Sequence, residues 1–255
     1  MLDRTTPAII NGLLAHLPHA DRTAMMRHVS TIELEFGALL CEPQQTLRHV
    51  YFPLSGFISL VAVVPKHPPL EMGMIGNEGM LGATLLLGVN VAPLQAIVQG
   101  AGTALCMSAA QMRRELAMRP ALRATLGRYL YVLTVQLSQS AACTRFHEVD
   151  QRLARWLLMT HDRAHAAFFH LTHQFLADML GVQRSAVTIA AGALARKNLI
   201  SYTRGTITVL SRAGLEAASC ACYKTVETDY QRLFRWSAAA LHGTAAGGGA
   251  NPTAA

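Results

Sequence analysis

One stretch, residues 173–192 (HQFLADMLGVQRSAVTIAAG), constrains the fold more than any other part of the chain. Leu176 and Leu180 give a first short helix an apolar face at the helical spacing of four. Gly181 then permits the backbone conformation of a tight turn, and Val187 faces inward from a second helix. The pattern predicts a helix-turn-helix; the alternative is an ordinary amphipathic helix pair in a core.

Polar side chains follow at the start of the second helix. Gln183, Arg184, Ser185 and Thr188 occupy positions that point away from the predicted core. A helix whose first turn carries hydrogen-bonding side chains is suited to enter the major groove of DNA. We therefore favour a nucleic-acid-binding role for this stretch.

The next residues strengthen this prediction. Residues 201–210 (SYTRGTITVL) alternate polar and apolar side chains around an Arg-Gly turn, which is typical of a β-hairpin. A hairpin directly after a helix-turn-helix forms the wing of a winged helix. Donors near the wing, at the cationic helix end and at the expected cap of the first helix are suited to phosphate oxygens. The expected phosphate contacts are Thr172, Arg196, Lys197, Tyr202 and Arg204.

Length and charge extend the prediction to the whole protein. A chain of 255 residues is too long for one winged helix, so a further domain is expected. The formal net charge of +7 is compatible with nucleic acid or with an anionic membrane surface. We find no apolar run long enough for a membrane span and no signal-peptide pattern at the N-terminus, which predicts a soluble cytoplasmic protein.

The first half of the chain contains short strand-like segments separated by glycine and proline, and these predict an antiparallel jelly roll. The expected fold class is α+β. It comprises N-terminal helices and a β jelly-roll sensor domain (1–119), a dimerisation helix and hinge (120–145), a winged helix-turn-helix (146–223), and a short helix with a disordered tail (224–255). The expected strands are residues 32–36, 49–53, 57–64, 70–75, 96–99 and 103–107, after helices at 9–17 and 21–29.

A long helix at about residues 120–142 carries leucines at four-three-four spacing, namely Leu126, Leu130, Leu133 and Leu137. This spacing is that of a short coiled-coil seam, and it predicts a parallel homodimer. The alternative is a helix that packs its leucines on its own domain.

The five cysteines indicate a reducing compartment rather than a disulfide framework. Cys220 and Cys222 form the one close pair, but a metal site needs further donors, so we interpret them as structural thiols. His161 and His165 share a helix face without a third ligand, and with His170 and His173 we interpret them as surface or boundary residues. No metal site is therefore predicted, although the sequence does not exclude that the Cys220/Cys222 pair or the His161/His165 pair binds a metal ion.

The order of domains resembles the Crp/Fnr superfamily of bacterial transcription regulators. The resemblance covers about residues 13–223 and rests on HVYFP at 49–53, SG at 55–56, SL at 59–60, IGNEG at 75–79 with Gly82, RLARWLL at 152–158, LADMLGV at 176–182, Arg184, Val187, LI at 199–200, RG at 204–205 and CACY at 220–223. It implies that the recognition helix reads base edges through Gln183, Arg184, Ser185 and Thr188. Many family members carry a glutamate where Ser185 stands, so the target sequence should differ from the best-known site.

The sensor half departs from its relatives. Members that bind cyclic nucleotides carry Gly-Glu and, about ten residues later, an arginine motif for the phosphate. This chain has Gly82-Ala83 and, at residues 91–96 (VAPLQA), no arginine, which argues against cyclic nucleotides because a buried phosphate needs a cationic partner. No cysteine precedes Cys41, so the iron–sulfur sensor is not expected. The sequence leaves open that one of His49, His67 and Cys41 is an axial ligand of a haem. We interpret each of them as a structural or exposed residue and expect no cofactor.

These features predict a homodimeric transcription regulator that binds double-stranded DNA at an inverted repeat. RNA polymerase is a further candidate partner, and the small-molecule effector is unknown. The alternative is a ligand-independent DNA-binding adaptor whose β domain only dimerises or binds a protein. A cupin-like metalloenzyme would need more histidines than His49 and His67 in the sheet region, so no enzyme is predicted.

Overall fold

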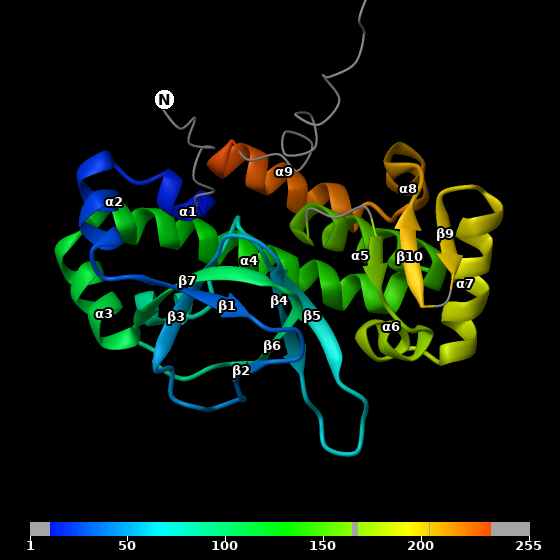
Figure 1. Ribbon diagram of the computed structural model, residues 1–255, viewed down its shortest axis with the longest axis horizontal. Helices are drawn as coiled ribbons and strands as arrows, with labels where there is room; N and C mark the ends of the chain where they lie inside the picture. The colour runs from blue at the N-terminus through cyan, green and yellow to red at the C-terminus, as the bar shows by residue number, and fades with distance from the viewer. Residues whose placement is uncertain (1–10, 165–167, 204, 236–255) are drawn as a thin grey trace, which may run out of the picture.

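The computed structural model describes residues 11–164, 168–203 and 205–235 (Figure 1). Its N-terminal half begins with two short helices, α1 (Gly12–Ala15) and α2 (His19–Met26). Seven strands and one 3-10 helix follow, and the expected fold class of antiparallel sheets, a long helix and a C-terminal helix-turn-helix is confirmed. The elements are β1 (Ser30–Leu34), β2 (Leu39–Cys41), β3 (His49–Pro53), β4 (Phe57–Ala62), β5 (Leu70–Ile75), η1 (Ala83–Leu87), β6 (Gln95–Gly100) and β7 (Gly102–Ser108).

The strands form two antiparallel sheets of a jelly roll. One sheet has the order β1-β7-β3 and the other has the order β2-β6-β4-β5. Alternate side chains such as Val50, Phe52, Ile58 and Val98 are buried in a shared apolar core. β3 and β5 have the bounds that the sequence predicts, whereas the three-residue β2 carries too little pattern to be recognised.

Helices α3 (Ala109–Met118) and α4 (Pro120–Phe146) close the core. Pro120 occupies the first turn of α4, where its missing amide hydrogen costs no hydrogen bond. The helix extends four residues beyond the expected end at 142 to Phe146, and the following residue, His147, has an extended backbone. Tyr129 lies on its buried face and donates a hydrogen bond of 3.1 Å to the Met80 carbonyl.

The four leucines of the expected seam on α4 differ in burial. Leu126 is 0 % exposed in the core of its own domain, so its side chain is not available to a second copy. Leu130, Leu133 and Leu137 are half-buried, and the first two pack against the same core. Helical periodicity alone could not distinguish a core-facing leucine from one that faces a partner.

The C-terminal half is a winged helix-turn-helix. It contains α5 (Val149–Ala164), β8 (Phe168–His170), α6 (His173–Leu180), α7 (Arg184–Arg196), β9 (Ile200–Thr203), β10 (Thr206–Val209) and α8 (Arg212–Ala218). The strands pair in the order β8-β10-β9, so the expected hairpin gains a third strand. Of the helices in the described residues, none is long and apolar enough to cross a bilayer.

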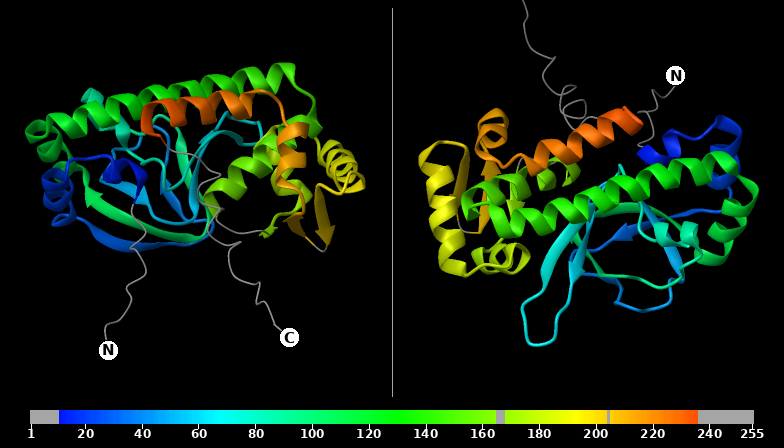
Figure 2. Two further views of the ribbon diagram at one scale, coloured as in Figure 1. Left: turned by 90° about the horizontal axis from the view of Figure 1, so that it is seen from above. Right: turned by 180° about the vertical axis from the view of Figure 1, so that it is seen from behind.

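The last described helix, α9 (Cys222–Phe234), returns to the N-terminal half and lies along α4 (Figure 2). Val226, Tyr230 and Phe234 join the apolar core of the jelly-roll half. The Phe234 ring packs edge-on against His16 of the segment after α1, with 5.4 Å between centroids. The C-terminal helix therefore belongs by packing to the jelly-roll half, and the expected tail at 236–255 lies outside the described residues.

Candidate nucleic-acid interface

Helix α6 begins at an N-cap threonine. The Thr172 hydroxyl accepts a hydrogen bond of 3.1 Å from the backbone N–H of Phe175, as the sequence predicts. Leu176, Ala177 and Leu180 are buried in the core of the C-terminal domain. Gly181 ends the helix with φ of +61°, a left-handed conformation that favours glycine. The turn is thus fixed on its inner side and leaves the outer side of the next helix open.

Helix α7 presents the residues that the sequence assigned to base recognition. Arg184 is its first residue, and Val187 and Ala190 anchor it in the core. Its outer positions are exposed: Gln183, Arg184, Ser185 and Thr188. No side chain caps the amino end of α7, so its free backbone N–H groups add a partial positive charge beside Arg184.

Ile189 is an outward-facing residue of α7 that our sequence analysis missed. Its side chain is 71 % exposed and lies next to Thr188 on the same helix. An apolar side chain at this place is suited to contact the C5 methyl group of thymine. The available signal was an isoleucine at a position where helical periodicity predicts a polar residue.

His173 connects the two helices with the wing. Its Nδ1 lies 2.9 Å from the Thr188 Oγ1, and its ring stacks on Tyr202 of β9 with 4.3 Å between centroids. Thr188 also donates a hydrogen bond of 3.1 Å to the Arg184 carbonyl. Burial and the nearby Arg184 charge lower the pKa of His173. The expected boundary histidine therefore serves as a positioning contact for the recognition helix.

The wing and the far end of α7 hold the expected phosphate contacts. Tyr202 is half-buried under His173, whereas Arg196 and Lys197 are exposed. The twelve helical steps from Arg184 to Arg196 correspond to about 18 Å along the axis. The two groups of cations thus lie at opposite ends of one helix, a separation suited to different parts of a duplex. Arg204, which the sequence predicts at the tip of the wing, lies outside the described residues.

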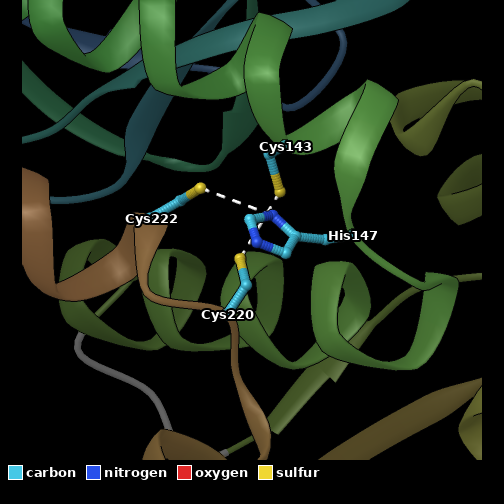
Figure 3. Close-up of side chains that lie close together, drawn as sticks. All are labelled: Cys143, His147, Cys220 and Cys222. Carbon is cyan, nitrogen blue, oxygen red and sulfur yellow. Dashed lines mark hydrogen bonds between the residues drawn. The ribbon is translucent and has the colours of Figure 1, made fainter.

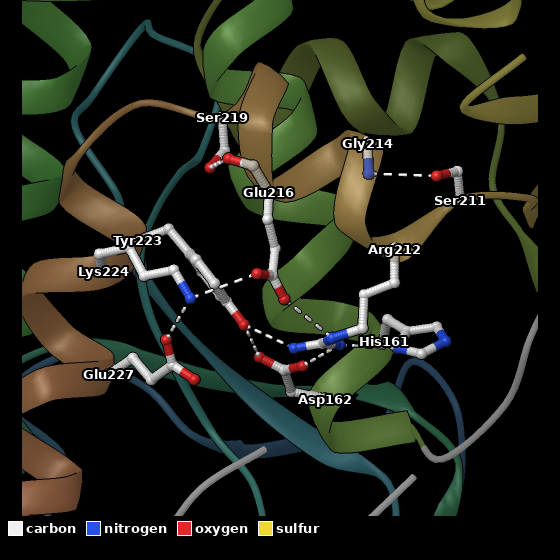
Figure 4. Close-up of polar contacts among 10 residues, drawn as sticks. All are labelled: His161, Asp162, Ser211, Arg212, Gly214, Glu216, Ser219, Tyr223, Lys224 and Glu227. Carbon is white, nitrogen blue, oxygen red and sulfur yellow. Dashed lines mark hydrogen bonds and ion pairs between the residues drawn. The ribbon is translucent and has the colours of Figure 1, made fainter. Parts of the chain in front are cut away.

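A buried polar network fixes the domain that carries α7 (Figure 4). Arg212 of α8 donates to Asp162 of α5 at 2.6 Å and to the hydroxyl of Tyr223 in α9 at 2.7 Å. Tyr223 in turn donates to Asp162 at 3.0 Å. Burial raises the pKa of Asp162, and the Arg212 charge opposes this shift. One arginine therefore joins the three helices that support the wing.

The helix-turn-helix also touches the jelly roll directly. A side chain added at Gly181 would meet Leu70 Cδ1 of β5 at 2.8 Å. The Trp156 indole of α5 donates a hydrogen bond of 2.9 Å to Glu71 of the same strand. Strand β5 therefore contacts both the turn of the helix-turn-helix and its supporting helix, which gives the jelly roll a short route to α7.

The jelly roll has a cavity where relatives in the Crp/Fnr superfamily are expected to bind their ligand. Its lining includes Gly82, Ala83, Ala92 and Pro93, with Leu130 and Leu133 of α4 on one side. The lining side chains are apolar apart from Thr84, and none of these described residues is an arginine or a lysine. Its described lining therefore offers no positive charge to a phosphate group.

Comparison with known proteins agrees with this geometry. A profile of the Crp-like helix-turn-helix domain matches residues 151–218. Residues 151–218 therefore form a Crp-like helix-turn-helix domain, as the sequence predicts. No curated protein matches the chain.

Several solved structures share the fold of about three quarters of the chain. FixK2 from Bradyrhizobium japonicum is 13 % identical with a TM-score of 0.64, and the match covers 76 % of this chain and 98 % of FixK2. The c-di-GMP responsive regulator CLP from Xanthomonas campestris is 16 % identical with a TM-score of 0.62, covering 76 % and 100 %. A CRP-family regulator from Thermus thermophilus is 18 % identical with a TM-score of 0.62, covering 74 % and 96 %. At these identities the likeness concerns the fold alone.

Proposed function

We propose that this protein is a transcription regulator of the Crp/Fnr type and binds an inverted repeat as a homodimer, with each α7 reading one half-site. The observation that carries the proposal is the exposed first turn of α7, in which Gln183, Arg184 and Ser185 project from a helix anchored by Val187. A guanidinium at this position can donate two hydrogen bonds to guanine O6 and N7. Arg184 is therefore the main base-reading residue.

Phosphate contacts set the position of the protein on the duplex in this account. Thr172, Arg196, Lys197, Tyr202 and Arg204 supply them from the cap of α6, the end of α7 and the wing. Contacts of this kind carry no sequence information, but they make the affinity fall steeply with salt. Half-buried Leu130, Leu133 and Leu137 on α4 supply the dimer contact.

The effector is proposed to be an uncharged molecule, or to be absent. The apolar cavity beside Gly82 supports the first possibility, because a ligand there touches α4 through Leu130 and Leu133. Such a ligand changes the relative position of the two recognition helices only if it binds one arrangement of the dimer more tightly than the other. If no small molecule changes the affinity for DNA, the result would favour the alternative of a ligand-independent adaptor.

The test is fluorescence-anisotropy binding to a duplex selected from a randomised library, beside a scrambled duplex, over a salt series. A preference of about a thousandfold, with one dimer per duplex and a steep salt slope, is the expected result. Equal weak binding to both duplexes would contradict sequence-specific recognition. Selected sites without two-fold symmetry would contradict the homodimer on an inverted repeat.

A further inference from the structure

Four metal-ligating side chains that are distant in the sequence meet at the junction of α4 and α9. Cys143 lies near the end of α4 and His147 follows it, while Cys220 precedes α9 and Cys222 begins it. The three sulfurs surround the imidazole ring of His147 (Figure 3). The four potential ligand atoms all lie within 4.8 Å of one another.

The spacing of these atoms is that of a tetrahedral metal centre. Zinc–sulfur bonds of about 2.3 Å and zinc–nitrogen bonds of about 2.0–2.1 Å imply S···S edges of about 3.8 Å and S···N edges of about 3.6 Å. The Cys143 and Cys220 sulfurs are 3.5 Å apart, and the Cys222 sulfur lies 3.6 Å from the His147 Nδ1. A small contraction or rotation of the remaining side chains brings all four atoms to bonding distance of one ion.

The surroundings are also those of a built site. Cys143, Cys220 and Cys222 are 2–4 % exposed and are free thiols, whereas His147 is half-buried and gives access from one side. Three thiolates and one neutral imidazole around a divalent ion carry one net negative charge. The buried Arg155 of α5 interacts electrostatically with all three cysteines and balances that charge.

We propose that Cys143, His147, Cys220 and Cys222 form a Cys3His site for a soft divalent metal ion, with Zn²⁺ as the expected occupant. Thiolate and imidazole ligands in tetrahedral geometry favour zinc over magnesium, calcium or manganese. The three thiol protons are released to solvent when the sulfurs bind the ion. The sequence analysis singled out only Cys220 and Cys222 and interpreted them as structural thiols, because Cys143 and His147 lie more than seventy residues away in the sequence.

The place of the site in the fold suggests its role. The ion joins the end of the interdomain helix α4 to the start of α9, directly beside the hinge between α4 and α5. α9 then extends along α4 to the core of the jelly roll. A bound metal therefore fixes the angle at which the winged helix leaves α4, and it links this angle to the sensor half.

The experiment uses the full chain, stripped of metal with a chelator under reducing conditions and titrated with Co²⁺. We expect one equivalent to bind with a thiolate-to-cobalt charge-transfer band and the strong visible bands of tetrahedral cobalt. One equivalent of Zn²⁺ should remove these bands and raise the melting temperature. Absence of the thiolate band, or octahedral cobalt spectra, would overturn the proposal.

Matched cysteine variants locate the site. Cys143→Ser and Cys222→Ser should weaken the charge-transfer band and lower the affinity for cobalt, whereas Cys41→Ser, at a buried thiol of the jelly roll, and Cys106→Ser should change neither. A band of unchanged intensity in the first two variants would place the cobalt elsewhere and refute the assignment.

A measurement on the unmodified chain covers the case in which a variant fails to fold. Alkylation followed by mass spectrometry should show that Zn²⁺ slows modification of Cys143, Cys220 and Cys222 but leaves Cys106 unchanged. Equal alkylation rates with and without Zn²⁺ would overturn the proposal. So would a Cys143–Cys220 disulfide that forms in the protein despite saturating Zn²⁺ and reductant.

Discussion

Arg163 of α5 forms an ion pair with Glu78 of the jelly roll, with 2.8 Å between Nη2 and Oε1, and both side chains are almost fully buried. The arginine Nε also donates to the same carboxylate oxygen at 2.8 Å. The pair connects the sensor half with the helix that supports the winged helix. A charge that loses its partner in such an environment costs far more than an exposed one.

The first prediction is that Glu78→Gln lowers the free energy of unfolding by about 3–5 kcal/mol, because it leaves the Arg163 charge buried and unpaired. Denaturant titration followed by circular dichroism measures the effect. Asp229→Asn is the matched control, since it removes the partner of the exposed Arg232 and should leave the midpoint nearly unchanged. Equal shifts in the two variants would contradict an interdomain role for the Glu78 pair.

Stability should also depend on the protonation of Glu71, which receives hydrogen bonds from Ser59 and Trp156. Burial raises its pKa to about 7 from an ordinary value of 4.5, although Arg155 and Arg163 of α5 oppose the shift. The folded state therefore binds the proton more tightly than the unfolded state. The resulting stabilisation is complete below pH 4.5 and is lost as the pH rises through about 7.

Glu71→Gln tests this dependence, because the amide resembles the protonated acid. The urea midpoint of the unmodified protein should fall between pH 5.5 and 8 by more than that of the variant. Parallel pH profiles for the two proteins would show that another group titrates in this range.

Gly181→Ala should destabilise the winged helix by about 1–2 kcal/mol, because an alanine at φ of +61° is strained. The new methyl group would also meet Leu70 Cδ1. The double variant with Leu70→Ala removes the contact but not the backbone strain, so thermal melts of both separate the two causes. A Gly181→Ala protein as stable as the unmodified one would mean that the turn adopts another conformation.

The dimer seam predicts that Leu137→Glu yields monomers, since a carboxylate cannot be buried between two copies of α4 without a partner. Sedimentation velocity reports the mass. Ala124→Glu introduces the same charge at an exposed position of the same helix and should leave a dimer. A dimeric Leu137→Glu protein would place the interface elsewhere.

Local patterns predicted much of this fold. Alternation identified β3 and β5 to the residue, and the apolar spacing around Gly181 identified α6 and α7, because both signals lie within one element. The same helical periodicity predicts that Arg184 and Ser185 point away from the core, and both are exposed.

Contacts between distant segments could not be predicted in this way. Leu126 fits a dimer seam by periodicity, yet packing against the sheets buries it in its own domain. The role of His173 depends on its stacking against Tyr202 of the wing, and Cys143 meets Cys220 only after α9 has folded back along α4. Such juxtapositions depend on the tertiary arrangement, which has no signature in a single segment.

The most direct test of the central claim is the affinity of Arg184→Ala for the selected duplex and for a scrambled one, measured side by side. The account predicts a loss of about 1–3 kcal/mol on the selected duplex and almost none on the scrambled one. Arg113→Ala, at an exposed arginine of α3, should change neither affinity. Equal losses on both duplexes, or no loss on the selected one, would contradict base recognition by the first turn of α7.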